Sequence, residues 1–272
     1  MATQPDVIHT ISSLTEEFVA AGLQQGMTVL VHSSMKQIGG WVVGGAEAVL
    51  YALLDAIGDD GTLMMPTHTT DNTDPSRWQN PPIPEAWWQI TRDNMPPYHP
   101  ATSITRQMGI LPEQFRRWDG VLRSNHPIGS FAAKGKYAKA LTSNHDLAEM
   151  FGDGSPISAL YDLDGYVMLL GVPYDNCTSL HLAEYRADFL GKEMISEGCA
   201  MLVDGERQWV RFEMLALETD DFDHIGALYE QANPDAVRYG TVGKATTRLF
   251  KVRPLVDFAV DWMTKHRDLR NG

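Results

Sequence analysis

The stretch from residue 27 to residue 65 constrains the fold more than any other part of the chain. A short apolar run at 27–31 is typical of a buried strand, and a glycine-rich loop follows it. Apolar residues then recur at helical spacing from Val49 to Ile57, before a second apolar run at 62–65. Strand, glycine loop, helix and strand in this order predict a βαβ unit, in which the two strands lie parallel in one sheet.

The rest of the chain carries a mixture of strand and helix patterns. We expect one more buried strand at 166–172, three more helices at 106–118, 180–189 and 255–266, and a β-hairpin at 200–212. Residues 66–100 contain eight of the fifteen prolines together with three tryptophans, which is typical of a long ordered loop that shapes a pocket. Because no internal repeat or domain boundary is visible, we expect a single α/β domain over residues 1–272.

The composition limits the classes of partner. The chain has 22 Lys and Arg against 35 Asp and Glu, a net charge of −13, which argues against nucleic acid and anionic membranes. A cationic small molecule is compatible with this charge, and so is simple solubility. There is no apolar run long enough to cross a membrane, no signal-peptide pattern and no disulfide framework from the two cysteines. We therefore expect a cytoplasmic location.

The glycine-rich loop after the first strand is the first candidate binding site. In open α/β sheets, ligands bind beyond the carboxyl ends of the strands, and the backbone of a glycine-rich turn can approach a phosphate or amide closely. The spacing of the glycines at 39–45 matches neither a dinucleotide fingerprint nor a P-loop. Taken alone, the loop is better explained as a tight turn that needs glycine at positive φ.

The second candidate is the turn after the strand at 166–172. Thr178 or Ser179 can cap the helix that follows, and His181 then lies in its first turn, where the helix dipole disfavours imidazolium. Glu184 lies on the same helix face and can accept the Nδ1 proton of His181, which leaves Nε2 free to act as a general base. A surface His–Glu pair without function is the alternative, because such pairs are common at this spacing.

Polar side chains also follow the second strand. His68 and Asp71 can join His181 and Glu184 as ligands of a metal, which would give a metal-dependent hydrolase. Carboxylates at this position, Asp74 included, can equally bind ammonium groups of a substrate. The HxxD spacing is unspecific, and there is no HExxH motif or cysteine cluster.

For three further features we favour a structural role over a functional one. His126, before a proline, is expected to be a buried histidine that fixes a turn. Cys177, four residues before His181, is a conceivable thiolate nucleophile, but a small filler residue in a turn is preferred. The acidic run at 218–223 is expected to be a solvated face, of interest only if the ligand is a polycation.

Seven motifs occur in order over nearly the whole chain: HSS at 32–34, Gly39 with WVVGG at 41–45, MPTHTTD at 65–71, MGILPE at 108–113, RSNHPIGSFA at 123–132, TSLHLAE at 178–184, and the segment 242–262. This ordered set resembles the aminoglycoside 3-N-acetyltransferase family, the antibiotic N-acetyltransferases. The resemblance implies a mixed-sheet α/β domain distinct from the common GNAT fold. It also implies acetyl transfer from acetyl-CoA to the 3-amino group of the deoxystreptamine ring of a cationic aminoglycoside, with no metal. It leaves open whether the protein is a monomer or a homodimer.

The resemblance also implies roles for individual residues. His181 would be the general base, Glu184 its orienting partner, and Thr178 or a backbone N–H near Ser33 or Ser34 the oxyanion donor. Acetyl-CoA would contact His32, Ser33, Ser34, Gly39, Val42, Val43, Gly44, Ser103 and Arg106. Ammonium groups of the substrate would contact Asp71, and more weakly Asp74 and Asp223.

One departure from the family pattern concerns the turn before the His181 helix. The family reads Asn-Thr-Ser there, whereas this chain reads Asn-Cys-Thr-Ser at 176–179. Three alternatives to aminoglycoside acetylation stay open. They are the metal-dependent hydrolase, an acyltransferase acting on another amine, and a non-catalytic protein that binds cationic antibiotics.

Overall fold

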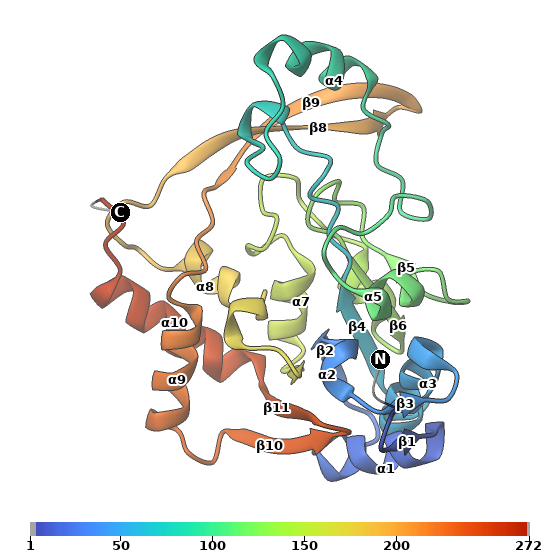
Figure 1. Ribbon diagram of the computed structural model, residues 1–272. Helices are drawn as coiled ribbons and strands as arrows, with labels where there is room; N and C mark the ends of the chain where they lie inside the picture. Colours follow the sequence, from blue (N-terminus) through green and yellow to red (C-terminus); the bar gives the residue numbers. More distant parts are fainter. Residues whose placement is uncertain (1–3, 271–272) are drawn as a thin grey trace.

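The computed structural model describes residues 4–270 and centres on a seven-stranded mixed sheet (Figure 1). Its strand order is β10-β11-β7-β2-β4-β6-β5, in which β7, β2 and β4 run parallel and the outer strands run antiparallel to their neighbours. The strands are β2 Thr28–Ser33, β4 Thr62–Pro66, β5 Leu122–Arg123, β6 Phe131–Gly135, β7 Tyr166–Leu170, β10 Val237–Val242 and β11 Ala245–Lys251. The expected mixed-sheet α/β domain is confirmed.

The βαβ unit lies at the centre of this sheet, as expected. The helix α3 (Gly45–Ile57) connects β2 to β4, and the register of the two parallel strands pairs Leu30 with Met64. The helix ends at Gly58, which has a φ of 65° that favours glycine. On its other side β2 pairs in parallel with β7, so three strands direct their carboxyl ends to one edge.

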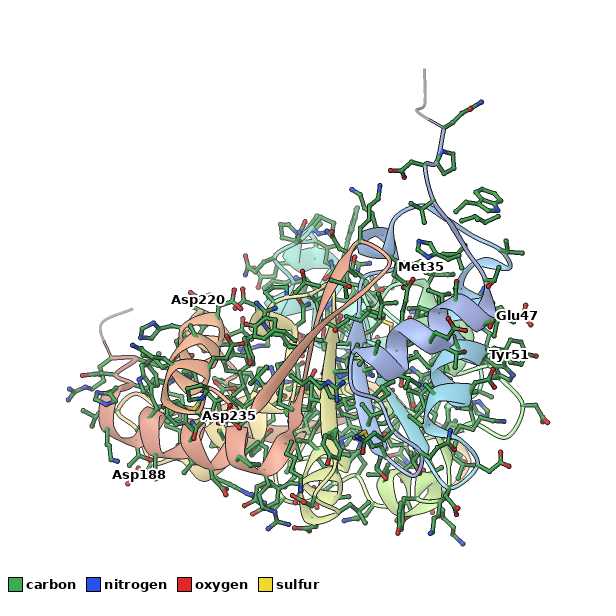
Figure 2. The ribbon with its side chains drawn as sticks, turned by 90° about the horizontal axis from the view of Figure 1, so that it is seen from below. Met35, Glu47, Tyr51, Asp188, Asp220 and Asp235 are labelled. Carbon is green, nitrogen blue, oxygen red and sulfur yellow. The ribbon has the colours of Figure 1, made fainter. Side chains whose placement is uncertain are left out.

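Successive residues of the central strands face opposite layers of helices, as the alternation of side chains along a strand requires. In β2, Val29 and Val31 pack into the layer formed by α1 (Ile11–Ala20), α3 and α5 (Ile110–Phe115), whereas Leu30 packs into the opposite layer. That opposite layer contains α6 Ala138–Thr142, α7 Pro156–Asp162, α8 Leu180–Arg186, α9 Phe222–Ala232 and α10 Val252–His266. Figure 2 shows α1 and α3 on one side and α9 and α10 on the other.

The proline-rich stretch packs against a long hairpin at the top of Figure 1. The hairpin is formed by β8 (Met194–Val203) and β9 (Glu206–Leu215), and is longer than the expected 200–212. The side chain of Asn72 accepts from and donates to the backbone of Ala200, at 2.9 and 2.8 Å. The expected long ordered loop holds the short helices η1 Pro75–Arg77, η2 Glu85–Trp87 and α4 Trp88–Asn94.

Several expected boundaries are wrong. The helix expected at 106–118 is reduced to α5, because Gln107 and Gly109 have φ values of 57° and 84° that interrupt a helix. The helix expected at 180–189 ends at Arg186, and the one expected at 255–266 begins at Val252.

The glycine-rich loop is a turn of the kind expected from its sequence. Gly39 and Gly44 are among its glycines at positive φ. The loop leads from α2 (Met35–Ile38) into a two-stranded pairing of β3 (Trp41–Val42) with β1 (Ile8–His9). Among the described residues, no helix is both long and apolar enough to cross a bilayer.

Candidate active site

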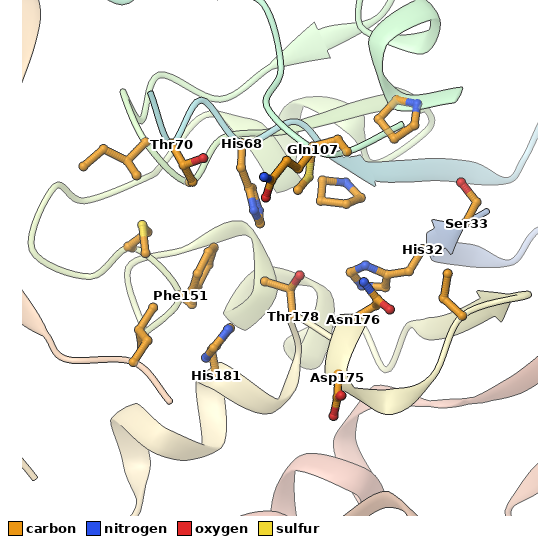
Figure 3. A pocket seen from close by; sticks show the side chains of 18 residues that line it. His32, Ser33, His68, Thr70, Gln107, Phe151, Asp175, Asn176, Thr178 and His181 are labelled. Atoms are coloured by element: carbon orange, nitrogen blue, oxygen red, sulfur yellow. The ribbon is translucent and has the colours of Figure 1, made fainter. Parts of the chain in front are cut away.

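A cavity of about 340 Å³ lies beyond the carboxyl ends of the three parallel strands (Figure 3). This is the position at which ligands bind in open α/β sheets. One wall comes from the end of β2 and the segment after β4, and the facing wall comes from the turn that leads into α8. The polar and aromatic side chains of the lining are His32, Ser33, His68, Thr70, Gln107, Phe151, Asp175, Asn176, Thr178 and His181.

His181 and Glu184 form the pair that their spacing predicts. His181 lies in the first turn of α8, and its Nδ1 donates to Oε2 of Glu184, which is fully buried. Phe151 stacks on the imidazole with ring centroids 5.1 Å apart, and Phe222 meets it edge-on at 4.9 Å. Within the described residues, Nε2 makes no hydrogen bond, and the ring lines the cavity. The ring is thus fixed, with an acceptor nitrogen left for a ligand.

The turn before α8 differs from the sequence expectation in one respect. Ser179 is at the N-cap position with helical φ and ψ, and neither it nor Thr178 makes a side-chain capping bond. The first turn instead begins with the backbone N–H of His181 donating to the carbonyl of Thr178, at 3.1 Å. The Thr178 side chain lines the cavity on the same side as His181 (Figure 3).

Glu184 is held by a cluster that local sequence patterns do not predict. Its Oε1 accepts a 2.6 Å bond from Nη1 of Arg267 and a 3.0 Å bond from the backbone N–H of Glu218. The same guanidinium donates from Nε to Asp221 at 2.8 Å, and also from Nη2 to that carboxylate. Arg267 follows α10 and lies 83 residues from Glu184 in sequence, so no spacing signal connects them.

Two further histidines of the cavity are uncharged. Burial, followed by the charge of His181, lowers the pKa of His32 to about 3. Burial, followed by the charges of His32 and His181, lowers the pKa of His68 to about 3 as well. Within residues 4–270 the Nε2 atoms of His32 and His68 are buried without a hydrogen-bond partner. Both rings therefore offer unused polar groups to a bound molecule.

The structure agrees with the structural roles that we expect for His126 and Cys177. Nδ1 of His126 accepts from the backbone N–H groups of Ile128 and Gly129, at 3.2 and 2.9 Å, so this ring fixes the turn. Burial raises the pKa of the Cys177 thiol to about 12, and its side chain is fully buried. A thiol in this state is a poor nucleophile at neutral pH.

The metal-site hypothesis has no geometric support. His68 lines the cavity, but the carboxylate of Asp71 is 67% exposed and pairs with Nη1 of Arg106 at 3.1 Å. Across residues 4–270, no three His, Cys, Asp or Glu side chains come together in a way that could hold a metal ion.

The residues expected to contact acetyl-CoA divide into two groups. Ser33 and Ser34 line a hollow of about 260 Å³ that shares Ser33, Gln107 and Met108 with the cavity. The Ser33 hydroxyl is buried without a partner in the described chain, but the Ser34 N–H already donates to the carbonyl of Leu170. Neither the cavity nor the hollow is lined by Gly39, Val42, Val43, Gly44, Ser103 and Arg106.

The three carboxylates expected to bind a cationic substrate have different surroundings. Asp71 and Arg106 border a third hollow, of about 530 Å³, which shares Thr70 and Gln107 with the cavity. Asp223 and the cavity residue Asp175 each accept a backbone N–H from the other.

Asp74 holds the proline-rich loop and does not line the cavity. It is buried in ion pairs with Arg92 and Arg211, at 2.6 and 3.2 Å. Sequence reasoning missed Gln107, which borders all three spaces and carries a positive φ unusual for a residue other than glycine.

Comparisons with known proteins identify the family of the chain. The family model described as aminoglycoside 3-N-acetyltransferase matches residues 30–264. The chain is 42% identical over 255 residues to the SPbeta prophage-derived aminoglycoside N(3')-acetyltransferase-like protein YokD of Bacillus subtilis, covering 93% of this chain and 92% of the relative. The crystal structure of YokD matches with a TM-score of 0.93 over 96% of both chains.

Two further relatives extend the comparison. Aminoglycoside N(3)-acetyltransferase VII of Streptomyces paromomycinus is 38% identical, over 97% of this chain and 94% of its own. The solved structure of AAC-IIIb as a binary complex with CoASH has a TM-score of 0.84 at 29% identity, over 97% of this chain and 99% of its own. Fold, motif order and near-complete coverage agree, and the chain belongs to the aminoglycoside 3-N-acetyltransferase family of acetyltransferases.

Proposed function

We propose that the protein transfers the acetyl group of acetyl-CoA to the 3-amino group of the 2-deoxystreptamine ring of aminoglycosides. The observation that carries this proposal is the buried His181–Glu184 pair, whose free Nε2 faces a cavity at the carboxyl ends of the parallel strands. The family membership and the CoASH complex of AAC-IIIb support acetyl-CoA as the donor.

In this reaction His181 is the general base. Glu184 accepts from Nδ1, which fixes the tautomer so that Nε2 has a lone pair. Nε2 removes a proton from the amine as its nitrogen attacks the thioester carbonyl. The N–C bond forms, the C–S bond breaks and the thiolate leaves with its electron pair, to be protonated from His181 or water. A positioned base of this kind typically contributes ~10²–10⁴-fold to the rate.

The tetrahedral intermediate requires a hydrogen-bond donor for its oxyanion. Because the Ser34 N–H is already used in the β2–β7 pairing, we assign this role to the Thr178 hydroxyl, which lines the cavity beside His181. Thr178 precedes the first turn of α8, so the donor and the base come from one rigid segment.

The two hollows beside the cavity fit the two substrates. The hollow at 33–36 and 107–111 includes Lys36 and the Ser33 hydroxyl, which has no hydrogen-bond partner within residues 4–270. These groups suit the amides and phosphates of CoA. The hollow that includes Asp71 and Trp78 suits a cationic sugar, since a carboxylate attracts ammonium groups and an indole ring packs on a sugar face. Both meet the cavity at Gln107, so both substrates reach His181 in a single ternary complex.

Thiol release from acetyl-CoA tests this proposal, with gentamicin, neomycin, apramycin and a simple arylamine as acceptors. We expect release with an aminoglycoside in the wild type, about a 10²–10⁴-fold loss in His181→Ala, and retained activity in Cys177→Ala. Release with the arylamine alone would indicate an acyltransferase for another amine. No release with any acceptor, or loss of activity on treatment with a chelator, would contradict the proposal.

A further inference from the structure

We propose that Arg267 is a positioning residue that fixes Glu184 and sets the pH range in which His181 works as a base. This inference rests on the proposed acetyl transfer, and it adds the segment after α10 to the machinery of the site. Arg267 does not line the cavity, so it acts on the reaction through Glu184 and His181.

The contacts of the guanidinium leave Glu184 one orientation. Nη1 donates to Oε1 of Glu184, while Nε and Nη2 donate to the Asp221 carboxylate. The Glu218 N–H also donates to Oε1, so Oε2 is the oxygen left for His181. Three separate segments therefore converge on one carboxylate: α8 itself, the turn that enters α9, and the end of α10.

Arg267 is also held rigidly from its own side. Its side chain is 2% exposed and lies over the rings of Phe189 and Phe222, at 5.1 and 5.9 Å from their centroids. Its backbone N–H donates to the carbonyl of Met263, and Leu269 two residues on donates to Leu190. The segment that carries Arg267 is thereby fastened to the segment that follows α8.

The cluster sets one guanidinium, that of Arg267, against the two carboxylates of Glu184 and Asp221. Burial alone lowers the pKa of Arg267, but the hydrogen bonds and charges of Asp221 and Glu184 outweigh burial and raise it. The guanidinium therefore stays charged. Other titratable groups around the pair are Glu218, Tyr185, Lys192, His32, His68 and Asp175.

A lysine cannot replace this arginine fully. One ammonium group is a single point of charge, whereas the planar guanidinium contacts two carboxylates from different nitrogens. We expect Arg267→Lys to keep the pH profile near that of the wild type while lowering kcat about tenfold, because the charge stays and the geometry is lost.

The sharpest test uses two neutralising substitutions with opposite signs. Arg267→Gln removes a positive charge, so the acid limb of the pH profile of kcat/KM should move about one unit to higher pH. Asp221→Asn removes a negative charge that is connected to the imidazole only through Arg267 and Glu184, so the limb should move a few tenths of a unit to lower pH. Arg270→Gln is the matched control, since Arg270 lies in the same segment, is exposed and, among residues 4–270, forms an ion pair only with Asp268.

Circular dichroism and thermal melting first establish that each variant is folded. The proposal would be overturned if Arg267→Gln is folded and its pH profile of kcat/KM has the same acid limb as the wild type. It would also be overturned if the acid limbs of Asp221→Asn and Arg267→Gln move in the same direction. If Arg267→Gln does not fold, the direction of the Asp221→Asn shift decides. A second readout needs no substrate: the NMR signal of the His181 ring, assigned with His181→Gln, is followed against pH in each variant. If the wild type releases no thiol, the proposed function fails, and the NMR titration still decides the role of Arg267.

Discussion

Acidification below pH 6.5 should destabilise this protein steeply, because four of its histidines are buried without charge. Burial lowers the pKa of His32 and of His68 to about 3, that of His145 to about 4, and that of His126 well below 6.5. In the unfolded chain each regains an ordinary pKa near 6.5. Between these values the unfolded chain binds more protons than the folded one, so the free energy of unfolding falls as the pH falls.

The size of the effect follows from these pKa values. At pH 5 a histidine that must stay neutral in the folded state costs about 2 kcal/mol, because 1.36 kcal/mol accompanies each pH unit below 6.5. The three residues with pKa values near 3 and 4, His32, His68 and His145, together cost about 6 kcal/mol, which is a large part of the stability of an ordinary domain, and burial of His126 acts in the same direction. This cost is absent above pH 6.5. It grows as the pH falls, until the pH reaches the folded-state pKa values near 3 and 4.

Urea unfolding at pH 7.5, 6.5, 5.5 and 5 measures this dependence. His32→Gln removes one of the groups that take up a proton on unfolding. Between pH 7.5 and pH 5 its free energy of unfolding should therefore fall by about 2 kcal/mol less than that of the wild type. His99→Gln is the control, because His99 is exposed. Equal stability of the wild type at pH 7.5 and pH 5, or parallel curves for the wild type and His32→Gln, would refute the reasoning.

Two other substitutions test the surroundings of the site. Burial raises the pKa of Asp74, but hydrogen bonds from Arg92 and Ser76 outweigh burial and lower it to about 2. The free energy of unfolding of Asp74→Asn should therefore be about 2 kcal/mol lower at pH 7. The proline-rich loop should also loosen, which would speed proteolysis within 72–95. Unchanged stability would mean that the ion pair contributes nothing. Phe151→Leu removes the ring stacked on His181, so kcat should fall about tenfold with KM nearly unchanged, and a larger change in KM would show that Phe151 contacts substrate instead.

The parts of the fold that the sequence predicted correctly are those determined locally. The βαβ unit is one example, because apolar runs and helical spacing within forty residues are enough to specify it. The His181–Glu184 pair is another, since three residues along a helix bring the two side chains together. The helix expected at 106–118 failed, because the positive φ values of Gln107 and Gly109 interrupt it, and a positive φ at a residue other than glycine has no helical-spacing signal.

The parts that could not be predicted depend on contacts distant in sequence. Asp71 and Asp74 look alike in a loop sequence, yet one is exposed beside Arg106 and the other is buried between Arg92 and Arg211. Arg267 gives no signal at all, because its partners are 46 and 83 residues away. Spacing rules describe neighbours on one element, and these pairings arise only when separate elements pack.

The placement of charge around the cavity separates the capture of a cation from its deprotonation. An amine attacks only after losing its proton, and a carboxylate beside it would hold that proton in place. Under the proposed function, the exposed Asp71 and Asp175 attract an ammonium group at the rim, where water screens them. Deeper in, His32 and His68 are neutral, so the wall around His181 favours the uncharged amine. The Glu184 carboxylate that bonds to His181 is fully buried, does not line the cavity and is paired with Arg267, so it orients the base without contacting the ammonium form.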